Sequence, residues 1–174
     1  MKSGSGYSIV GKMVVICLSF ALPLFWLLYT NIAAVNGDIR FSSLELGGDR
    51  YLRPLAALLK AVSQAGLRAA RGEDPGAAAR EADAAFAEMG KLEPTVGRDL
   101  QFTPEGLALR QRERLTVAQV EAGWRAARRA QGAPEAVREA HAGVLADVSG
   151  MVAHAGDTSN LILDPDLDSY YMMD

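Results

Sequence analysis

The chain has 174 residues and a formal net charge of −3; 49% of its residues are hydrophobic, but only 7% are aromatic. Alternating β-branched runs are absent outside the N-terminal segment, and no basic stripe is interleaved with aromatic residues, which argues against a β-rich fold and against nucleic-acid binding. Long runs rich in Ala, Leu, Glu and Arg, broken by short Gly/Pro clusters, predict an all-α protein.

The segment from Met13 to Val35 contains no charged residue and has the length of about 20 residues that a bilayer core requires. We predict a transmembrane helix over 13–35, with residues 1–12 in the cytoplasm because Lys2 and Lys12 precede the span. Residues 36–174 would then lie in the periplasm, so the protein would cross the bacterial inner membrane once.

A cleaved signal peptide is the alternative to this anchor. It is disfavoured because the apolar run is long for a signal peptide and because Ala33-Ala34-Val35 is a poor cleavage site. A buried core helix is disfavoured because the segment is apolar on all faces.

Beyond the membrane segment, apolar residues recur at alternating steps of three and four, the period of helices packed in a bundle or coiled coil. The first of these helices is expected to continue directly from the membrane span, since no strong helix breaker separates them. The four stripes are Leu44, Gly48, Tyr51, Leu55, Leu58 and Val62; Ala78, Ala82, Ala85, Met89, Leu92 and Val96; Val117, Val120, Trp124 and Ala127; and Val137, His141, Val144, Val148, Met151 and Ala155.

Helix-stop signals separate the four stripes. In the 72–76 cluster, Asp74 is the expected N-cap and Pro75 the first helical residue. The Pro-containing stretch 93–104 either ends or kinks the second helix, and the chain restarts as a helix at its Thr-Pro end. The cluster 132–135 separates the third helix from the fourth.

Many residues of the stripes are Ala, which permits close helix approach but buries little apolar area per residue. Such a bundle is expected to be marginal alone. Dimerisation, or further helices after residue 174, would supply the missing stability, so the bundle is expected to be incomplete.

No catalytic constellation is found, and the protein is not expected to be an enzyme. The two imidazoles, His141 and His154, are expected on one helix about 20 Å apart by helix rise, so they cannot share a substrate or a metal. His141 is read as a packed or interface residue. No phosphate loop, CxxC pair or HExxH is present, and no cofactor is predicted.

The chain after Arg138 has acidic side chains but no Lys or Arg, which is typical of a solvated acidic face. Within it, Asp164, Asp166 and Asp168 resemble the first alternating ligands of a calcium loop. Ser169 stands where that loop needs Gly, and Pro165 favours a helix start. We therefore interpret Asp164 as an N-cap and predict no metal site.

Candidate ligand-binding residues are arginines, because guanidinium groups between helices can pair with carboxylates through two hydrogen bonds. Arg50 and Arg53 are expected on the first helix after the membrane, and Arg125, Arg128 and Arg129 on the third. The alternative is that these are surface arginines that pair with Glu or cover the Ala-rich stripes.

Two stretches resemble signatures of a periplasmic helical-bundle sensor region. They are GDIRFSSLELGGDRYLRPLAALL, residues 37–59, and GDTSNLILDPDLDSYYMMD, residues 156–174. This region occurs in methyl-accepting chemotaxis proteins and in hybrid sensor histidine kinases. The second motif is the more specific, and its residues are Asn160, Asp164, Pro165, Asp166, Asp168, Tyr170 and Tyr171.

The resemblance implies an all-α receptor portion that senses an unknown small-molecule ligand and signals as a homodimer. We expect the membrane-anchored sensor region of a signal-transduction receptor, foremost of chemotaxis type, that transmits helix shifts across the membrane. The alternatives are the sensor of a hybrid histidine kinase and a stand-alone membrane-anchored helical scaffold.

Overall fold

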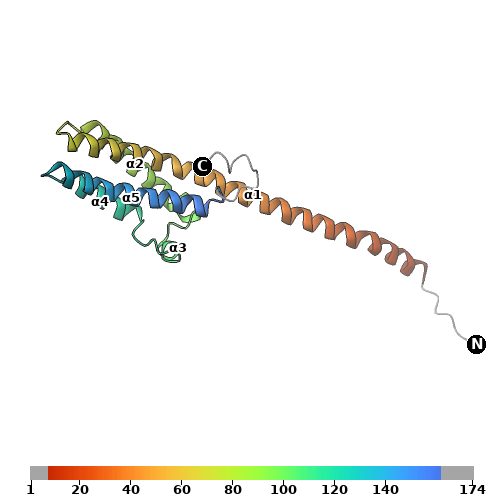
Figure 1. The fold of residues 1–174 in the computed structure, drawn as a ribbon. Helices are drawn as coiled ribbons and strands as arrows, with labels where there is room; N and C mark the ends of the chain where they lie inside the picture. The colour runs from red at the N-terminus through yellow and green to blue at the C-terminus, as the bar shows by residue number, and fades with distance from the viewer. Residues whose placement is uncertain (1–7, 162–174) are drawn as a thin grey trace, which may run out of the picture. The chain divides into compact units, whose positions relative to one another are not determined.

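The computed structural model describes residues 8–161, which form helices and turns with no strand, confirming the all-α fold (Figure 1). The chain divides into two units, residues 1–42 and residues 43–174, and the first helix contributes to both. The elements in chain order are α1 (Ile9–Ala70), α2 (Gly76–Leu92), the π-helical turn η1 (Glu93–Gly97), α3 (Pro104–Ala108), α4 (Val117–Ala127) and α5 (Pro134–Thr158).

The first unit contains the apolar part of α1, which Pro23 does not interrupt. An 18-residue window of this helix has a mean hydropathy of 2.1, and none of that window is buried. Two of its hydroxyl groups are satisfied within the helix, since Ser19 donates to the Ile16 carbonyl at 2.8 Å and Thr30 to the Leu27 carbonyl at 2.9 Å. By length and composition α1 is therefore able to cross a membrane.

In the second unit, α1, α2, α4 and α5 form an antiparallel bundle in which successive long helices alternate in direction. On the α1–α5 side, Gly66 faces His141 while Gly48 faces Ser159, so the two helices run in opposite directions. On the α4–α5 side, Gly123 faces Val144. The expectation that the first bundle helix continues from the apolar segment is confirmed by the bounds of α1.

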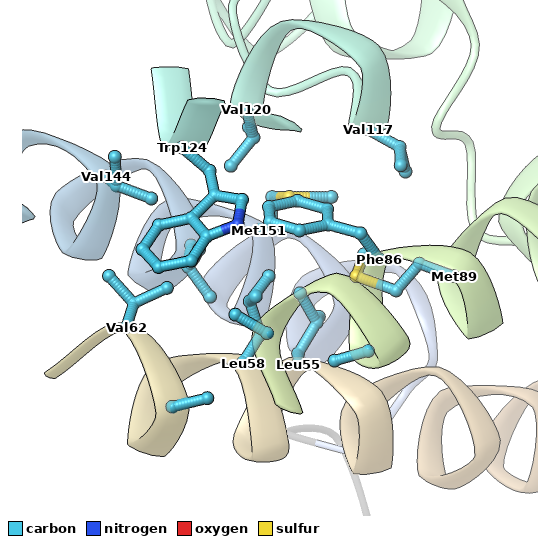
Figure 2. Packing of buried hydrophobic residues seen from close by; sticks show 14 of the residues in the cluster. Leu55, Leu58, Val62, Phe86, Met89, Val117, Val120, Trp124, Val144 and Met151 are labelled. Carbon is cyan, nitrogen blue, oxygen red and sulfur yellow. The ribbon is translucent and has the colours of Figure 1, made fainter. Parts of the chain in front are cut away.

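The four predicted stripes form the core of this bundle. Figure 2 shows side chains from all four long helices meeting around Trp124 and Met151. All stripe residues are buried except Leu44, Leu92 and Val96, which are half-buried. Glycine also lets the helices come close together beside these stripes: a Cβ on Gly66, which follows the first stripe on α1, would lie only 2.8 Å from the Cβ and Cγ of His141.

The breaks between helices occur where they are predicted, with one boundary shifted. The structure starts α2 at Gly76 rather than at Pro75, although the Asp74 carboxylate still accepts a hydrogen bond from the Gly76 N–H at 2.8 Å. Thr103 caps α3 by accepting from the Gly106 N–H at 3.1 Å, as the Thr-Pro signal predicts. Both side chains satisfy backbone donors that a helix start leaves unpaired.

The Pro-containing stretch after α2 neither ends the helix at once nor leaves it regular. Residues 93–97 widen into the π turn η1, which accommodates Pro94 although proline has no N–H to donate. The chain that follows returns across the bundle and buries Leu100, Phe102, Leu107 and Leu115. The periodic pattern did not predict these core residues, because the segment between η1 and α4 is largely irregular.

Two glycine substitutions distinguish close helix approach from helix propensity. Gly66→Ala is expected to lower the free energy of unfolding by about 1–3 kcal/mol, because its Cβ would overlap His141. Gly143→Ala, on the exposed face of α5, is expected to raise it by about 0.5–1 kcal/mol, because the added Cβ would meet no other part of the described chain within 4 Å apart from its own turn of helix. Urea unfolding of the full chain in detergent measures both; changes of the same sign would contradict the close α1–α5 contact.

Candidate functional site

A hollow of about 170 Å³ lies where the ends of α1 and α4 and the start of α2 meet α5, and we call it the tip cavity. Five of its eleven lining residues are alanine. These small side chains let the helices approach each other and leave space where the helices end. Trp124 and His141 close it from α4 and α5. The lining residues are Ala65, Ala69, Asp74, Pro75, Gly76, Ala79, Trp124, Ala127, Arg128, Ala130 and His141.

Asp83 on α2 ties α4 to the bundle beside this cavity. Its carboxylate accepts from the Trp124 indole N–H at 2.9 Å and from Arg128 Nη1 at 2.9 and 2.7 Å. The Arg128 guanidinium also lies 5.7 Å from the centre of the Trp124 ring, within the range of a cation–π contact. A buried tryptophan needs an acceptor for its N–H, so the sequence implied a partner for Trp124 without identifying Asp83.

The tip cavity has charged groups at its mouth and an apolar interior. Asp74 and Arg128 are exposed, whereas Ala65, Ala79 and Ala127 are buried. His141 is buried edge-to-face against Trp124, with ring centres 5.9 Å apart. Its Nδ1 is 2.8 Å from the Val137 carbonyl; because a carbonyl only accepts, Nδ1 carries the proton.

The predicted arginines fall into two groups that the structure does not bring together. Arg125, Arg128 and Arg129 line an open concavity of about 290 Å³ at the C-terminal end of α4. Of the three, only Arg125 lies within the helix as predicted, because α4 ends at Ala127. Arg50 and Arg53 lie on α1 at least twelve residues before Ala65, which lines the tip cavity beside Trp124. That separation along α1 is about 18 Å at 1.5 Å per residue.

Three of these arginines are paired with carboxylates, which agrees with the alternative reading of surface ion pairs. Arg53 contacts Asp49 at 2.6 Å, Arg125 contacts Glu121 at 2.5 Å, and Arg128 contacts Asp83. The Arg50 and Arg129 side chains make no hydrogen bond or ion pair within residues 8–161. The structure thus places Arg128 in the lining of the tip cavity. Its neighbour Arg129 has no ion-pair partner within residues 8–161.

A second polar feature lies away from the tip cavity, where the Phe102 ring contacts Tyr51 in a tilted arrangement and His154 edge-on. The Phe102 ring centre is 4.6 Å from that of Tyr51 and 4.5 Å from that of His154. The Tyr51 hydroxyl and His154 Nδ1 are buried and have no hydrogen-bond partner among residues 8–161. Burial raises the pKa of the Tyr51 phenol, and the nearby Glu93 carboxylate adds to this rise. Burial also raises the pKa of Glu93 itself.

His154 joins α5 to the irregular segment after η1. Its Nε2 lies 3.1 Å from the Leu100 carbonyl and 3.2 Å from the Gln101 carbonyl, so Nε2 carries the proton in the neutral ring. Burial is the main reason why the pKa of His154 is lowered; hydrogen bonds to the two carbonyls oppose this effect, and the charges of Arg110 and Arg112 add to it. Both histidines are therefore packed residues, as expected for His141.

Of the terminal motif, only Asn160 lies within the described residues. It follows α5 with a φ of +62°, a left-handed conformation that asparagine tolerates better than most residues. Asp164, Pro165, Asp166, Asp168, Tyr170 and Tyr171 lie outside the described residues. Across residues 8–161, no group of three or more His, Cys, Asp or Glu side chains is placed to hold a metal ion.

Comparisons with known proteins give no further assignment. No family model, curated protein or solved structure matches this chain. The site must therefore be interpreted from its own residues.

The lowered pKa of His154 predicts a specific pH dependence of stability. The unfolded state takes up a proton near the ordinary histidine pKa of about 6.5, whereas the folded state does so only at lower pH, so stability falls as the pH drops below about 6.5. In His154→Gln, an amide N–H can still donate to the two carbonyls but cannot titrate. Thermal unfolding of the full chain in detergent between pH 7.5 and 5.5 should therefore show a smaller loss of Tm for this variant than for wild type. An equal loss in both would show that His154 does not cause it.

Proposed function

We propose that this chain is the membrane-anchored sensor portion of a bacterial signal-transduction receptor, foremost of the methyl-accepting chemotaxis type. The observation that carries the proposal is the continuity of α1. One uninterrupted helix contains both the apolar membrane-length segment and the buried stripe Tyr51–Val62 of the bundle. A ligand that shifts α1 within the bundle acts on the same helix that enters the bilayer.

The residues of the bundle also support a binding role. The described residues hold an apolar hollow with charged groups at its mouth, a common form of small-molecule site. Arg129, which makes no ion pair within residues 8–161, lines a concavity with Arg125 and Arg128 and adds positive charge nearby. In this proposal residues 13–35 span the inner membrane, residues 1–12 are cytoplasmic and residues 36–174 are periplasmic.

Membrane topology tests the proposal directly. In a Cys17→Ser background, Gln131→Cys in the exposed turn before α5 is expected to react with a membrane-impermeant maleimide in intact cells. The matched Ser3→Cys variant should react only after the membrane is permeabilised. An immunoblot should show the unprocessed chain in the membrane fraction. Labelling of Gln131→Cys only after permeabilisation, or a shortened soluble product, would refute the sensor proposal.

We further propose that the receptor is a homodimer that associates through the α1–α5 flank. This flank consists of the apolar side chains Leu52, Leu59, Leu67, Leu145 and Val152, which are half-buried or exposed. Leu52 and Leu59, like Leu145 and Val152, are seven residues apart, the spacing of a helix-packing seam. A hollow of about 300 Å³ that includes Leu67, Gly66 and Leu145 lies in the same flank and can receive side chains from a second copy.

A charge placed on this flank should disrupt the dimer. Leu67 is 50% exposed, so Leu67→Arg is expected to reduce the mass of the full chain in detergent from that of a dimer to that of a monomer, because an unpaired charge would have to be desolvated at the interface. Leu109→Arg, at an 82% exposed position outside the flank, serves as the matched control. Light scattering coupled to size exclusion measures the mass. A monomeric wild type, or equal effects of both variants, would contradict the interface.

A further inference from the structure

The irregular segment between η1 and α4, residues 98–115, is joined to α5 by side chains, and we call it the strap. Three polar contacts join the strap to α5: the Arg112–Asp157 ion pair at 2.7 Å, the Arg114–Asp147 ion pair at 3.1 Å, and the hydrogen bond from His154 Nε2 that the Leu100 and Gln101 carbonyls share at 3.1 and 3.2 Å. Within residues 8–161, the backbone N–H groups of the strap donate only to carbonyls of the strap itself or of η1. The strap can therefore leave α5 without breaking the backbone hydrogen bonds of a long helix.

His154 makes the strongest of these three contacts. In each ion pair one partner has a side chain that is at least 40% exposed, and exposed ion pairs contribute little to stability. His154 is fully buried and lies edge-to-face against Phe102. A buried hydrogen bond costs more to lose, because its groups are then left without a partner and without water. The imidazole and the Phe102 ring are therefore the main attachment of the strap to α5.

This contact fits a neutral imidazole and not a charged one. Nε2 already donates to the two carbonyls of the strap, and Nδ1 of His154 is buried with no hydrogen-bond partner among residues 8–161. A proton added to Nδ1 would create a buried donor, which is costly when nothing accepts from it. Once the strap has moved away, water can accept from Nδ1. Protonation of the ring therefore favours the form in which the strap has left α5.

The charged and titratable groups around His154 strengthen this preference. Burial is the main reason why the pKa of His154 is lowered, and two arginines of the strap add to this effect, whereas the hydrogen bonds to the two carbonyls oppose it. The next carboxylate along α5 is already paired with a strap arginine. Beyond Phe102 lies a phenol that is neutral, because burial raises its pKa, and a carboxylate of η1 lies near it. These groups are Arg110 and Arg112 on the strap, Asp157 on α5, Tyr51 on α1 and Glu93 on η1.

We propose that the strap is an acid-released element: protonation of His154 detaches residues 98–115 from α5, while the four long helices stay packed. Both ends of the strap remain anchored, since η1 continues α2 and Asp83 of α2 accepts a hydrogen bond from Trp124 of α4 at 2.9 Å. Detachment uncovers Tyr51 on α1, which packs against Phe102 in the attached form. The meaning of this release as a signal to α1 rests on the proposed sensor function. The release itself does not, so this proposal and the membrane topology fail independently.

The release should follow the charge of His154. With the strap detached, the imidazole takes up a proton near the ordinary histidine pKa of about 6.5, whereas with the strap attached it does so only at lower pH. Attachment is therefore strongest above about pH 6.5 and weakens as the pH falls below it. Between pH 7.5 and pH 5.5 the detached fraction should rise by up to about tenfold.

Hydrogen exchange of the full chain in detergent, read by mass spectrometry at pH 7.5 and pH 5.5, tests this proposal. Each exchange rate is divided by the intrinsic rate at the same pH, which gives a protection factor. On acidification the protection of peptides covering 98–115 should fall by about three- to tenfold, and that of peptides covering 117–127 in α4 by less than about twofold. Unchanged protection of the strap, or an equal fall in α4 that indicates unfolding of the whole bundle, would overturn the proposal.

Two variants identify the group that takes up the proton. His154→Gln keeps an N–H for the two carbonyls but cannot titrate, so the fall in strap protection should disappear. His141→Gln makes the same change in the other buried histidine of α5, which bonds to the Val137 carbonyl of its own helix, and should keep the fall. A fall that persists in His154→Gln, or one that is lost in His141→Gln, would contradict the proposal. If a variant does not fold, the comparison of the strap with α4 in the wild type still decides.

Discussion

The close approach of helices through alanine and glycine is the constraint on which the rest of the bundle depends. At Gly66 the backbone of α1 lies so near His141 that even a methyl group would overlap the imidazole. Helices this close need small residues along most of each seam, and so the larger core side chains gather where the seams allow them space. Trp124 fills one such place and the Tyr51–Phe102–His154 stack another.

This constraint also explains where polar groups are buried. Alanine seams contribute little apolar area, so specific polar contacts between elements help to define the packing. Asp83 fixes α4 against α2 through Trp124 and Arg128, and His154 fixes α5 against the carbonyls that follow η1. Each of these contacts joins residues more than forty positions apart in the sequence.

The helices could be predicted well from the sequence, because apolar periodicity and capping residues are local signals. The stripes, the breaks and the Thr103 cap needed only the identity of near neighbours, whereas α2 begins one residue later than Asp74 and Pro75 predicted. The buried residues of the segment from η1 to α4 could not be predicted, since Phe102 and Leu107 are buried but follow no period. For the site, Arg128 and His141 were singled out, but neither the tip cavity nor the role of Asp83 follows from spacing along one helix.

His141 lines both the tip cavity and the hollow of the α1–α5 flank. A side chain that forms a wall common to two sites cannot move for one of them without changing the shape of the other. Occupancy of the cavity and self-association through the flank would then be thermodynamically linked, each altering the equilibrium constant of the other by the same factor. In this way the buried imidazole of His141 would couple ligand binding within one monomer to the formation of the dimer.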